Sequence, residues 1–153
     1  MQLALFEPDI AANAAAAMRL AACLEVPLHV IEPCGFAWDP VRLRRVGLDY
    51  LDHAHLIRHP AFAAFEEARR RQGTRLVLLT TAADLRLDHA SFRPGDILMG
   101  GRESGGVPEA VHAAADLRLR IPIAAGRRSL NLVTALAIAL GEGLRQTRGW
   151  PPG

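Results

Sequence analysis

Ile97-Leu-Met-Gly-Gly-Arg-Glu-Ser-Gly-Gly-Val-Pro108 is an apolar segment that breaks into a glycine-rich loop. A second segment, Leu119-Arg-Ile-Pro-Ile123, runs on in the same way through a polar loop to Ser129-Leu130-Asn131. We interpret each as a strand that ends in a loop and then enters a helix. Open α/β sheets bind their ligands at the carboxyl ends of the strands, so these two loops are the first candidates for a ligand site.

The helix predicted after the second loop, Leu130 to Gln146, is almost wholly apolar. Its sequence places Leu130, Val133, Ala137, Leu140 and Leu144 on one side and Leu132, Leu136 and Ile138 on the other. A helix that is apolar around most of its circumference is covered by protein on two sides. We therefore expect one side to pack on the sheet and the other on a second subunit. The alternative is a fully internal helix of a monomer. Polar residues stand as a collar at its start: Arg127, Arg128, Ser129 and Asn131.

Upstream of these loops, strands and helices alternate without a linker or a repeat. We predict strands at 2–6, 28–31, 53–58, 75–80, 96–100 and 117–121, and helices at 11–25, 39–46, 61–72, 108–114 and 130–146. This alternation predicts an α/β fold, in which a mostly parallel sheet carries helices on both faces.

Length and composition indicate one domain. A chain of 153 residues can bury a single core, and we place the domain at 1–148 with a tail at 149–153. No apolar run approaches the ~18 to 20 residues of a membrane span. The amino terminus has no basic lead, which argues against a signal peptide, so we expect a cytoplasmic protein without membrane contact.

Cys23 and Cys34 have no partner cluster, and we expect two reduced, packed thiols.

All eighteen basic residues are arginine, which a GC-rich genome would explain. The absence of lysine still excludes a Schiff-base lysine, a phosphate-loop lysine and a lysine general base. Arginine suits phosphate recognition, and the arginines cluster at 42–45, 69–71 and 127–128. The middle cluster is typical of a solvated helix end, whereas the other two border polar loops and are candidates for RNA or another anion.

A dinucleotide or classical methyltransferase Rossmann fold needs glycines after its first strand, so that the backbone can approach the ligand. Here that turn is Glu7-Pro8-Asp9-Ile10-Ala11-Ala12-Asn13, without a glycine. The glycines appear instead at 100, 101, 105 and 106. The sequence therefore disfavours the Rossmann fold and places the ligand loops in the carboxy-terminal half.

Five separated motifs together resemble the SPOUT superfamily, and within it the small TrmL-type tRNA (cytidine/uridine-2′-O-)-methyltransferases. In chain order they are Phe6-Glu7-Pro8-Asp9-Ile10 with Asn13 and Arg19, the segment 31–38, the segment 42–50, the Gly101 loop, and Arg120-Ile121-Pro122 leading into Ser129-Leu130-Asn131. The resemblance covers nearly the whole chain.

The resemblance implies a carboxy-terminal trefoil knot, a homodimer and S-adenosylmethionine as the cofactor. Knots are close to absent among folds, so no propensity predicts one. By position, the cofactor-binding residues would be Leu79, Thr80, Gly101, Glu103, Ile121, Ser129 and Leu130. Glycine lets the backbone approach a ligand, and apolar side chains can sandwich a base. From the residues alone, Leu79 and Ile121 equally suit plain core packing.

The resemblance also implies a catalytic set of Arg19, Asn13, Ser129 and Asn131, which acts on a tRNA ribose without a metal. Arginine is a poor proton acceptor, so we favour stabilisation of the forming alkoxide by Arg19 over direct deprotonation; a surface arginine is the alternative. Asn13 and Asn131 also suit helix capping. Arg42, Arg44 and Arg45 would bind the anticodon-loop backbone of leucine tRNAs, and Trp38 or Tyr50 could stack on a base, although Trp38 equally suits the core.

The sequence departs from the family pattern at three places. Within Ala14 to Ala16 the pattern has a glycine and an asparagine. At Arg102 it has a proline, and at Val133 it has a serine. A non-catalytic RNA-binding or cofactor-binding relative is therefore the alternative to an enzyme. His53, His55 and His59 lack carboxylate support, and we expect surface or structural histidines rather than a metal site.

Overall fold

Seven parallel strands form one sheet in the structure, a computed structural model that describes residues 1–39, 41 and 53–153. In chain order they are β1 (Gln2–Phe6), β2 (Leu28–Ile31), β3 (Leu56–His59), β4 (Leu76–Leu79), β5 (Leu85–Arg86), β6 (Ile97–Gly100) and β7 (Leu117–Arg120). Their order across the sheet is β3-β2-β1-β6-β4-β7-β5, and every pairing is parallel. The predicted parallel sheet is confirmed.

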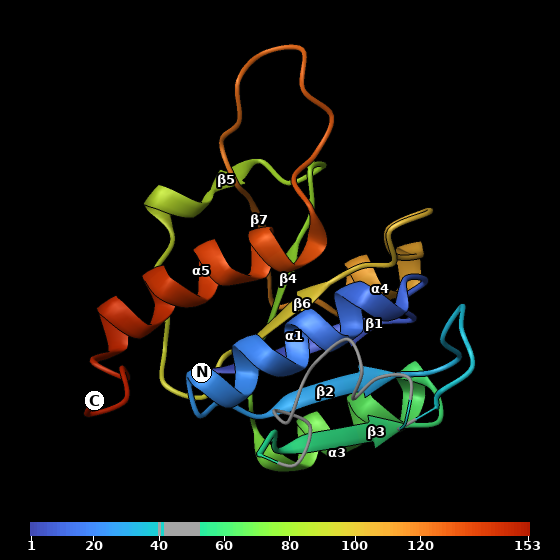
Figure 1. The fold of residues 1–153 in the computed structure, drawn as a ribbon. Coiled ribbons are helices and arrows are strands. Elements are labelled where there is room, and N and C mark those ends of the chain that lie inside the picture. The colour runs from blue at the N-terminus through green and yellow to red at the C-terminus, as the bar shows by residue number, and fades with distance from the viewer. Residues whose placement is uncertain (40, 42–52) are drawn as a thin grey trace.

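Helices cover both faces of this sheet, as predicted. Helix α1 (Ala11–Cys23) and helix α5 (Leu132–Thr147) lie in front of it in Figure 1, and α3 (Phe62–Gln72) and α4 (Glu109–Ala114) lie behind it. Alternate residues of each strand therefore enter two separate cores. Leu3, Leu98 and Leu119 pack with α1 and α5, whereas Ala4 and Met99 pack on the other face, with α3 and α4.

The predicted elements that fall within the described residues are present, with ends that differ by a few residues. The strand predicted at 53–58 begins only at Leu56, and Pro108 precedes α4 as its N-cap. Strand β5 and the 3₁₀ turn Leu87–His89 were not predicted, because two or three residues are too short for a periodic signal. The basic helix predicted at 39–46 falls largely outside the described residues.

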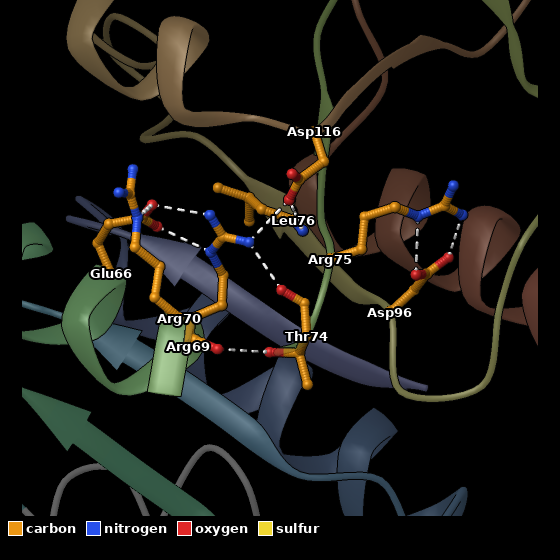
Figure 2. Close-up of polar contacts among 8 residues, drawn as sticks. All are labelled: Glu66, Arg69, Arg70, Thr74, Arg75, Leu76, Asp96 and Asp116. Atoms are coloured by element: carbon orange, nitrogen blue, oxygen red, sulfur yellow. Dashed lines mark hydrogen bonds and ion pairs between the residues drawn. The ribbon is translucent and has the colours of Figure 1, made fainter. Parts of the chain in front are cut away.

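Arg69 corrects the prediction of a solvated helix end, because its side chain is only 7% exposed. Its guanidinium donates to both carboxylate oxygens of Glu66 and, at 2.7 Å each, to Asp116 Oδ2 and the Thr74 carbonyl (Figure 2). Asp116 Oδ2 also accepts from the Leu76 N–H. One buried arginine thus ties the end of α3 to the starts of β4 and β7. The following residues, Arg70 and Arg71, are exposed as predicted.

The predicted sides of helix α5 were partly wrong. Leu136, Leu140 and Leu144 lie on one buried side, because residues four apart share a helix face, so Leu136 is not opposite the other two. The outer side of α5 is not buried within this chain: Ile138 is 43% exposed. The tail folds back on this helix, since the Trp150 ring lies 3.9 Å from where a Cβ on Gly141 would be.

The histidines and cysteines differ from one another in their surroundings. His53 and His55 are exposed, whereas His59 is buried against His29. Both cysteines are free, but Cys23 is exposed rather than packed. Cys34 is half-buried, and burial raises the pKa of its thiol to about 11. Within the described part of the chain, no helix is long and apolar enough to cross a membrane.

Candidate functional site

A cavity of about 540 Å³ lies at the carboxyl ends of β4, β6 and β7, three neighbouring strands. Its wall includes the whole set that the sequence analysis assigned to a cofactor: Leu79, Thr80, Gly101, Glu103, Ile121, Ser129 and Leu130. Asn13 and Asn131 line it as well. The segment between β7 and α5, which contributes several of these residues, projects beyond the sheet (Figure 1). The two loops singled out in the sequence therefore meet at one site.

The glycine loop after β6 is closed by a short backbone bridge. The Arg102 N–H donates to the Gly106 carbonyl at 3.1 Å, and the Gly106 N–H donates back to the Arg102 carbonyl at 2.8 Å. Gly101 has no room for a side chain, because a Cβ there would lie 2.7 Å from the Gly106 carbonyl carbon. Gly106 itself has a φ of +67°, a conformation that favours glycine. Glycine at 101 and 106 thus gives the loop its shape.

Glu103 connects this loop to the start of α1. Its Oε2 accepts from the Asp9 N–H at 2.8 Å, and its Oε1 accepts from the Asn13 side-chain amide at 2.8 Å. The Asn13 Oδ1 in turn accepts from the Asn131 amide at 3.1 Å. A hydrogen-bonded chain therefore runs from the glycine loop through α1 to the start of α5. Asn13 does not cap α1, whose N-cap residue is Ile10.

Asp9 holds the same loop from the other side. Its carboxylate accepts from the Ser104 N–H at 2.9 Å, while its own N–H is bound to Glu103. The hydrogen bonds from Ser104 lower the pKa of the Asp9 carboxyl below its ordinary value. Two acidic residues thus bind each other's segments reciprocally, and Asp9 is a site residue that the sequence analysis did not single out.

Asn131 is the N-cap of α5, one of the two roles considered for it. Its Oδ1 accepts from the Val133 N–H at 2.9 Å and from the Thr134 N–H at 3.2 Å. Val133, where the family pattern has serine, is half-buried and packs against the core shared by α1 and α5. The valine therefore adds apolar packing at this position, and Asn131 supplies the side-chain oxygen that caps the helix.

Arg102, the second departure from the pattern, binds the end of β1. Its Nη1 lies 3.2 Å from Glu7 Oε2, and its guanidinium lies 5.9 Å from the centroid of the Phe6 ring. Because Arg102 also lines the cavity, it places a positive charge beside the glycine loop. A proline at this position would lack both the charge and the N–H that bridges to Gly106.

The inner wall of the cavity is apolar, and much of it was not predicted. Leu132, at the start of α5, packs on the end of β6 so closely that a Cβ on Gly100 would collide with it. Ile10, Ile123, Leu132 and Ala135 line the cavity without having been singled out. Nothing in the sequence alone distinguishes these four residues from ordinary core residues. Apolar walls with a few polar groups are typical of cofactor and substrate pockets.

The remaining predicted residues lie elsewhere. Arg19 is exposed on α1 and is not among the described residues that line the cavity. Arg42, Arg44, Arg45 and Tyr50 lie outside the described residues. Trp38 stacks on Phe36 at 6.0 Å, and the Arg58 guanidinium lies 4.8 Å from the centroid of its ring.

Comparisons with known proteins show the family of the chain. Residues 1–141 match the model of the SpoU rRNA Methylase family. A relative from Ancylobacter novellus, named tRNA (cytidine(34)-2′-O)-methyltransferase, is 51% identical over 150 residues, which are 98% of this chain and 95% of the relative.

Solved structures show the same fold. One described as "Structural insights into the 2-OH methylation of C/U34 on tRNA" has a TM-score of 0.89 at 43% identity and covers 95% of this chain and 94% of its own. The SpoU methyltransferase AviRb from Streptomyces viridochromogenes, in complex with the cofactor AdoMet, has a TM-score of 0.81 at 26% identity and covers 95% of this chain and 57% of its own. The chain belongs to the SpoU rRNA methylase family, which confirms the resemblance to SPOUT methyltransferases.

Proposed function

We propose that this protein transfers the methyl group of S-adenosylmethionine to the ribose 2′-oxygen of nucleotide 34 in a tRNA, most specifically a leucine tRNA, in the cytoplasm. The observation that carries the proposal is the cavity at the ends of β4, β6 and β7, because it gathers all seven residues assigned to the cofactor. The names of the relatives at high identity and full coverage support the tRNA substrate and the position.

The residues of the cavity fit S-adenosylmethionine. A volume of about 540 Å³ lies within the range of ~300–1,000 Å³ typical of small-molecule sites. Leu79, Ile121 and Leu130 offer apolar surface for adenine, and Gly101 lines the same cavity with its backbone. When bound, the cofactor supplies a sulfonium methyl group, which is already a good electrophile.

The protein then has to orient the ribose, exclude water and stabilise charge on its oxygen. The chain from Glu103 through Asn13 to Asn131 holds the two loops at a fixed separation. Ser129 is suited to orient cofactor and ribose by hydrogen bonds. We retain Arg19 as the cation for the forming alkoxide, which requires that the RNA extend to α1 or that a second subunit present this residue. The trefoil knot stays a prediction of the resemblance.

RNA contacts would come from charged residues outside the cavity. We propose that Arg42, Arg44 and Arg45 bind phosphates of the anticodon loop, which makes affinity depend on salt. Trp38 is half-buried and packs against the core, and we propose that the exposed part of its side chain contacts a base.

We further propose a homodimer that buries the outer side of α5. Ile138 is 43% and Trp150 is 52% exposed, and the tail that carries Trp150 folds back on this helix. Exposed apolar side chains that gather on one element are typical of interfaces. Ile138→Glu should convert the dimer to a monomer in light scattering, whereas Glu67→Gln on the distant helix α3 should leave it dimeric.

The decisive experiment is methyl transfer to leucine tRNA, read by ribose-methyl mapping. We expect one methyl group at nucleotide 34, and none when that nucleotide carries a 2′-deoxyribose. Calorimetry with S-adenosylmethionine, together with methyl transfer to total tRNA, tests the alternative: a protein that binds the cofactor but methylates no RNA would be the non-catalytic relative. Transfer to the deoxyribose tRNA would place the methyl group on another atom or nucleotide and would contradict the proposal.

A further inference from the structure

One face of the sheet ends in exposed arginines at the β7–β5 edge. The backbone register joins His29, Ala4, Met99, Leu78 and Arg118 into one row across five strands. The first four side chains of this row are buried, whereas Arg118 is exposed. Arg120 lies two residues further on the same face, and Arg86 of β5 is its register partner. We call Arg86, Arg118 and Arg120 the arginine face.

The arginine face is a part of the sheet that no described helix covers. A parallel sheet normally has both faces covered, and its strands are then apolar on both sides. Leu119 follows that rule toward α5 and is buried, while its neighbours Arg118 and Arg120 are exposed on the opposite face. The sequence of β7, Leu-Arg-Leu-Arg, thus alternates between core and solvent.

The charges of this face are poorly compensated. Arg86 is paired with Asp88 at 2.8 Å. Among the described residues, no carboxylate lies within 4.0 Å of Arg118 or Arg120, although most other described arginines have such a partner. Arg120 donates only a long hydrogen bond, 3.5 Å, to the Asp84 carbonyl. Like charges directly opposite each other on neighbouring strands are unfavourable, so an anionic partner would stabilise Arg86 beside Arg120.

We infer that the arginine face binds phosphates of the tRNA outside the target nucleotide, an inference that rests on the proposed function. Arg120 is the last residue of β7, and the next residue, Ile121, lines the cavity. Arg118 and Arg120 lie ~7 Å apart along the strand, on the face opposite to the cavity residue Leu119. An RNA strand that leaves the cavity around the end of the sheet would therefore meet Arg120 first and Arg118 next. Guanidinium groups suit phosphate oxygens, and the face offers no apolar side chain that a membrane or a protein interface would bury.

The test is binding of full-length leucine tRNA at several salt concentrations, which needs no catalysis. The double variant Arg118→Gln/Arg120→Gln should bind more weakly, with a slope of log affinity against log salt reduced by about 1 for each arginine that contacts a phosphate. Calorimetry with S-adenosylmethionine should give an unchanged affinity. The control Arg71→Gln/Arg93→Gln removes the same charge from exposed residues at the opposite end of the strands and should bind like wild type.

A second variant separates RNA binding from protection of the sheet edge. Charges of either sign keep a sheet edge from pairing with other chains, and β7 lies next to the short edge strand β5. Arg118→Glu/Arg120→Glu should therefore keep the wild-type oligomeric state and bind tRNA even more weakly than the glutamine variant. Wild-type affinity and salt dependence in both double variants, or no tRNA binding by the wild type, would overturn the inference. Methyl transfer by the wild type reports separately on the proposed function.

Discussion

Glu103 uses both of its carboxylate oxygens to join the glycine loop to the segment that begins α1. Glutamine has the same shape but only one acceptor oxygen, so it can satisfy either the Asp9 N–H or the Asn13 amide. Glu103→Gln should therefore lose one charge-assisted hydrogen bond, worth roughly 1.5–3 kcal/mol. We expect weaker binding of S-adenosylmethionine in calorimetry and a lower melting temperature. Glu109→Gln, an exposed residue of α4, is the control; equal loss in both variants would contradict a specific role for Glu103.

Gly101 and Gly105 lie in the same loop but should differ sharply in tolerance. A Cβ at 101 would be 2.7 Å from backbone, which cannot move aside without reshaping the loop, whereas a Cβ at 105 meets only Arg102 Nε at 4.0 Å. Gly101→Ala should abolish cofactor binding and destabilise the protein, and Gly105→Ala should leave cofactor affinity near wild type. Calorimetry and thermal melting of both variants check this, and tight binding by Gly101→Ala would show that the loop tolerates a side chain.

For single residues, the sequence predicted which ones line the cavity better than it predicted their hydrogen-bond partners. The position of Glu103 in the motif placed it in the cavity, but nothing indicated that it binds Asp9. The run Arg69-Arg70-Arg71 predicted one solvated cluster, yet Arg69 alone is buried. The difference depends on Asp116 and the Thr74 carbonyl, which the fold brings to Arg69 and which neighbouring sequence does not reveal.

Helix α5 begins at a residue with two separable roles. Asn131 Oδ1 caps the helix, and Asn131 Nδ2 donates to Asn13. Asn131→Ala should lose both and cost about 1 kcal/mol, a fall of about 2–4 °C in melting temperature for a protein of this size. Asn131→Asp keeps the cap but cannot donate to Asn13. It should melt like wild type while binding the cofactor more weakly; cofactor affinity equal to wild type would show that the Asn13 link is dispensable.

Elements with strong periodicity were predicted to within a few residues, as for β1 and β2, which match fully. The sides of α5 were assigned less well, because its apolar residues surround the helix and periodicity could not say which side meets the sheet. Burial of Leu136 with Leu140, and exposure of Ile138, depend on where β6 and α1 lie. The start of α5 is set by the N-cap Asn131. An asparagine in a sequence is compatible with a helix start, but it also occurs elsewhere, so it does not fix the first residue of the helix.

The order of strands across the sheet is a property of the whole molecule that the sequence could not supply. Alternation predicts parallel strands, but it does not say that the chain, after β3 at one edge, crosses to place β4 beyond β6. That crossing brings the ends of β4, β6 and β7 together and so creates the cavity. It also places β7 near the other edge, where one side of Leu-Arg-Leu-Arg is left exposed.

A buried histidine pair couples the stability of the molecule to pH. Gln2 Nε2 donates to the Gly95 carbonyl, so Gln2 Oε1 accepts from His29 Nε2 at 2.8 Å. His29 Nδ1 is then the acceptor in its 2.9 Å contact with His59 Nε2. Burial, followed by the charge of His59, lowers the pKa of His29 to about 4, and burial also lowers the pKa of His59. Protonation of His29 at Nδ1 would set two N–H groups against each other.

Because the folded protein keeps His29 neutral, the unfolded chain binds the extra proton between its own pKa near 6.5 and about 4. The stabilisation is therefore complete above pH ~6.5 and is lost as the pH falls toward 4. Between pH 6.5 and 5 the loss from His29 should be about 1.5 kcal/mol. His29→Gln removes this titration, so its melting temperature should fall less steeply over that interval than that of wild type. His89→Gln, at an exposed histidine, should keep the wild-type slope, and equal slopes in all three proteins would show that His29 does not control acid stability.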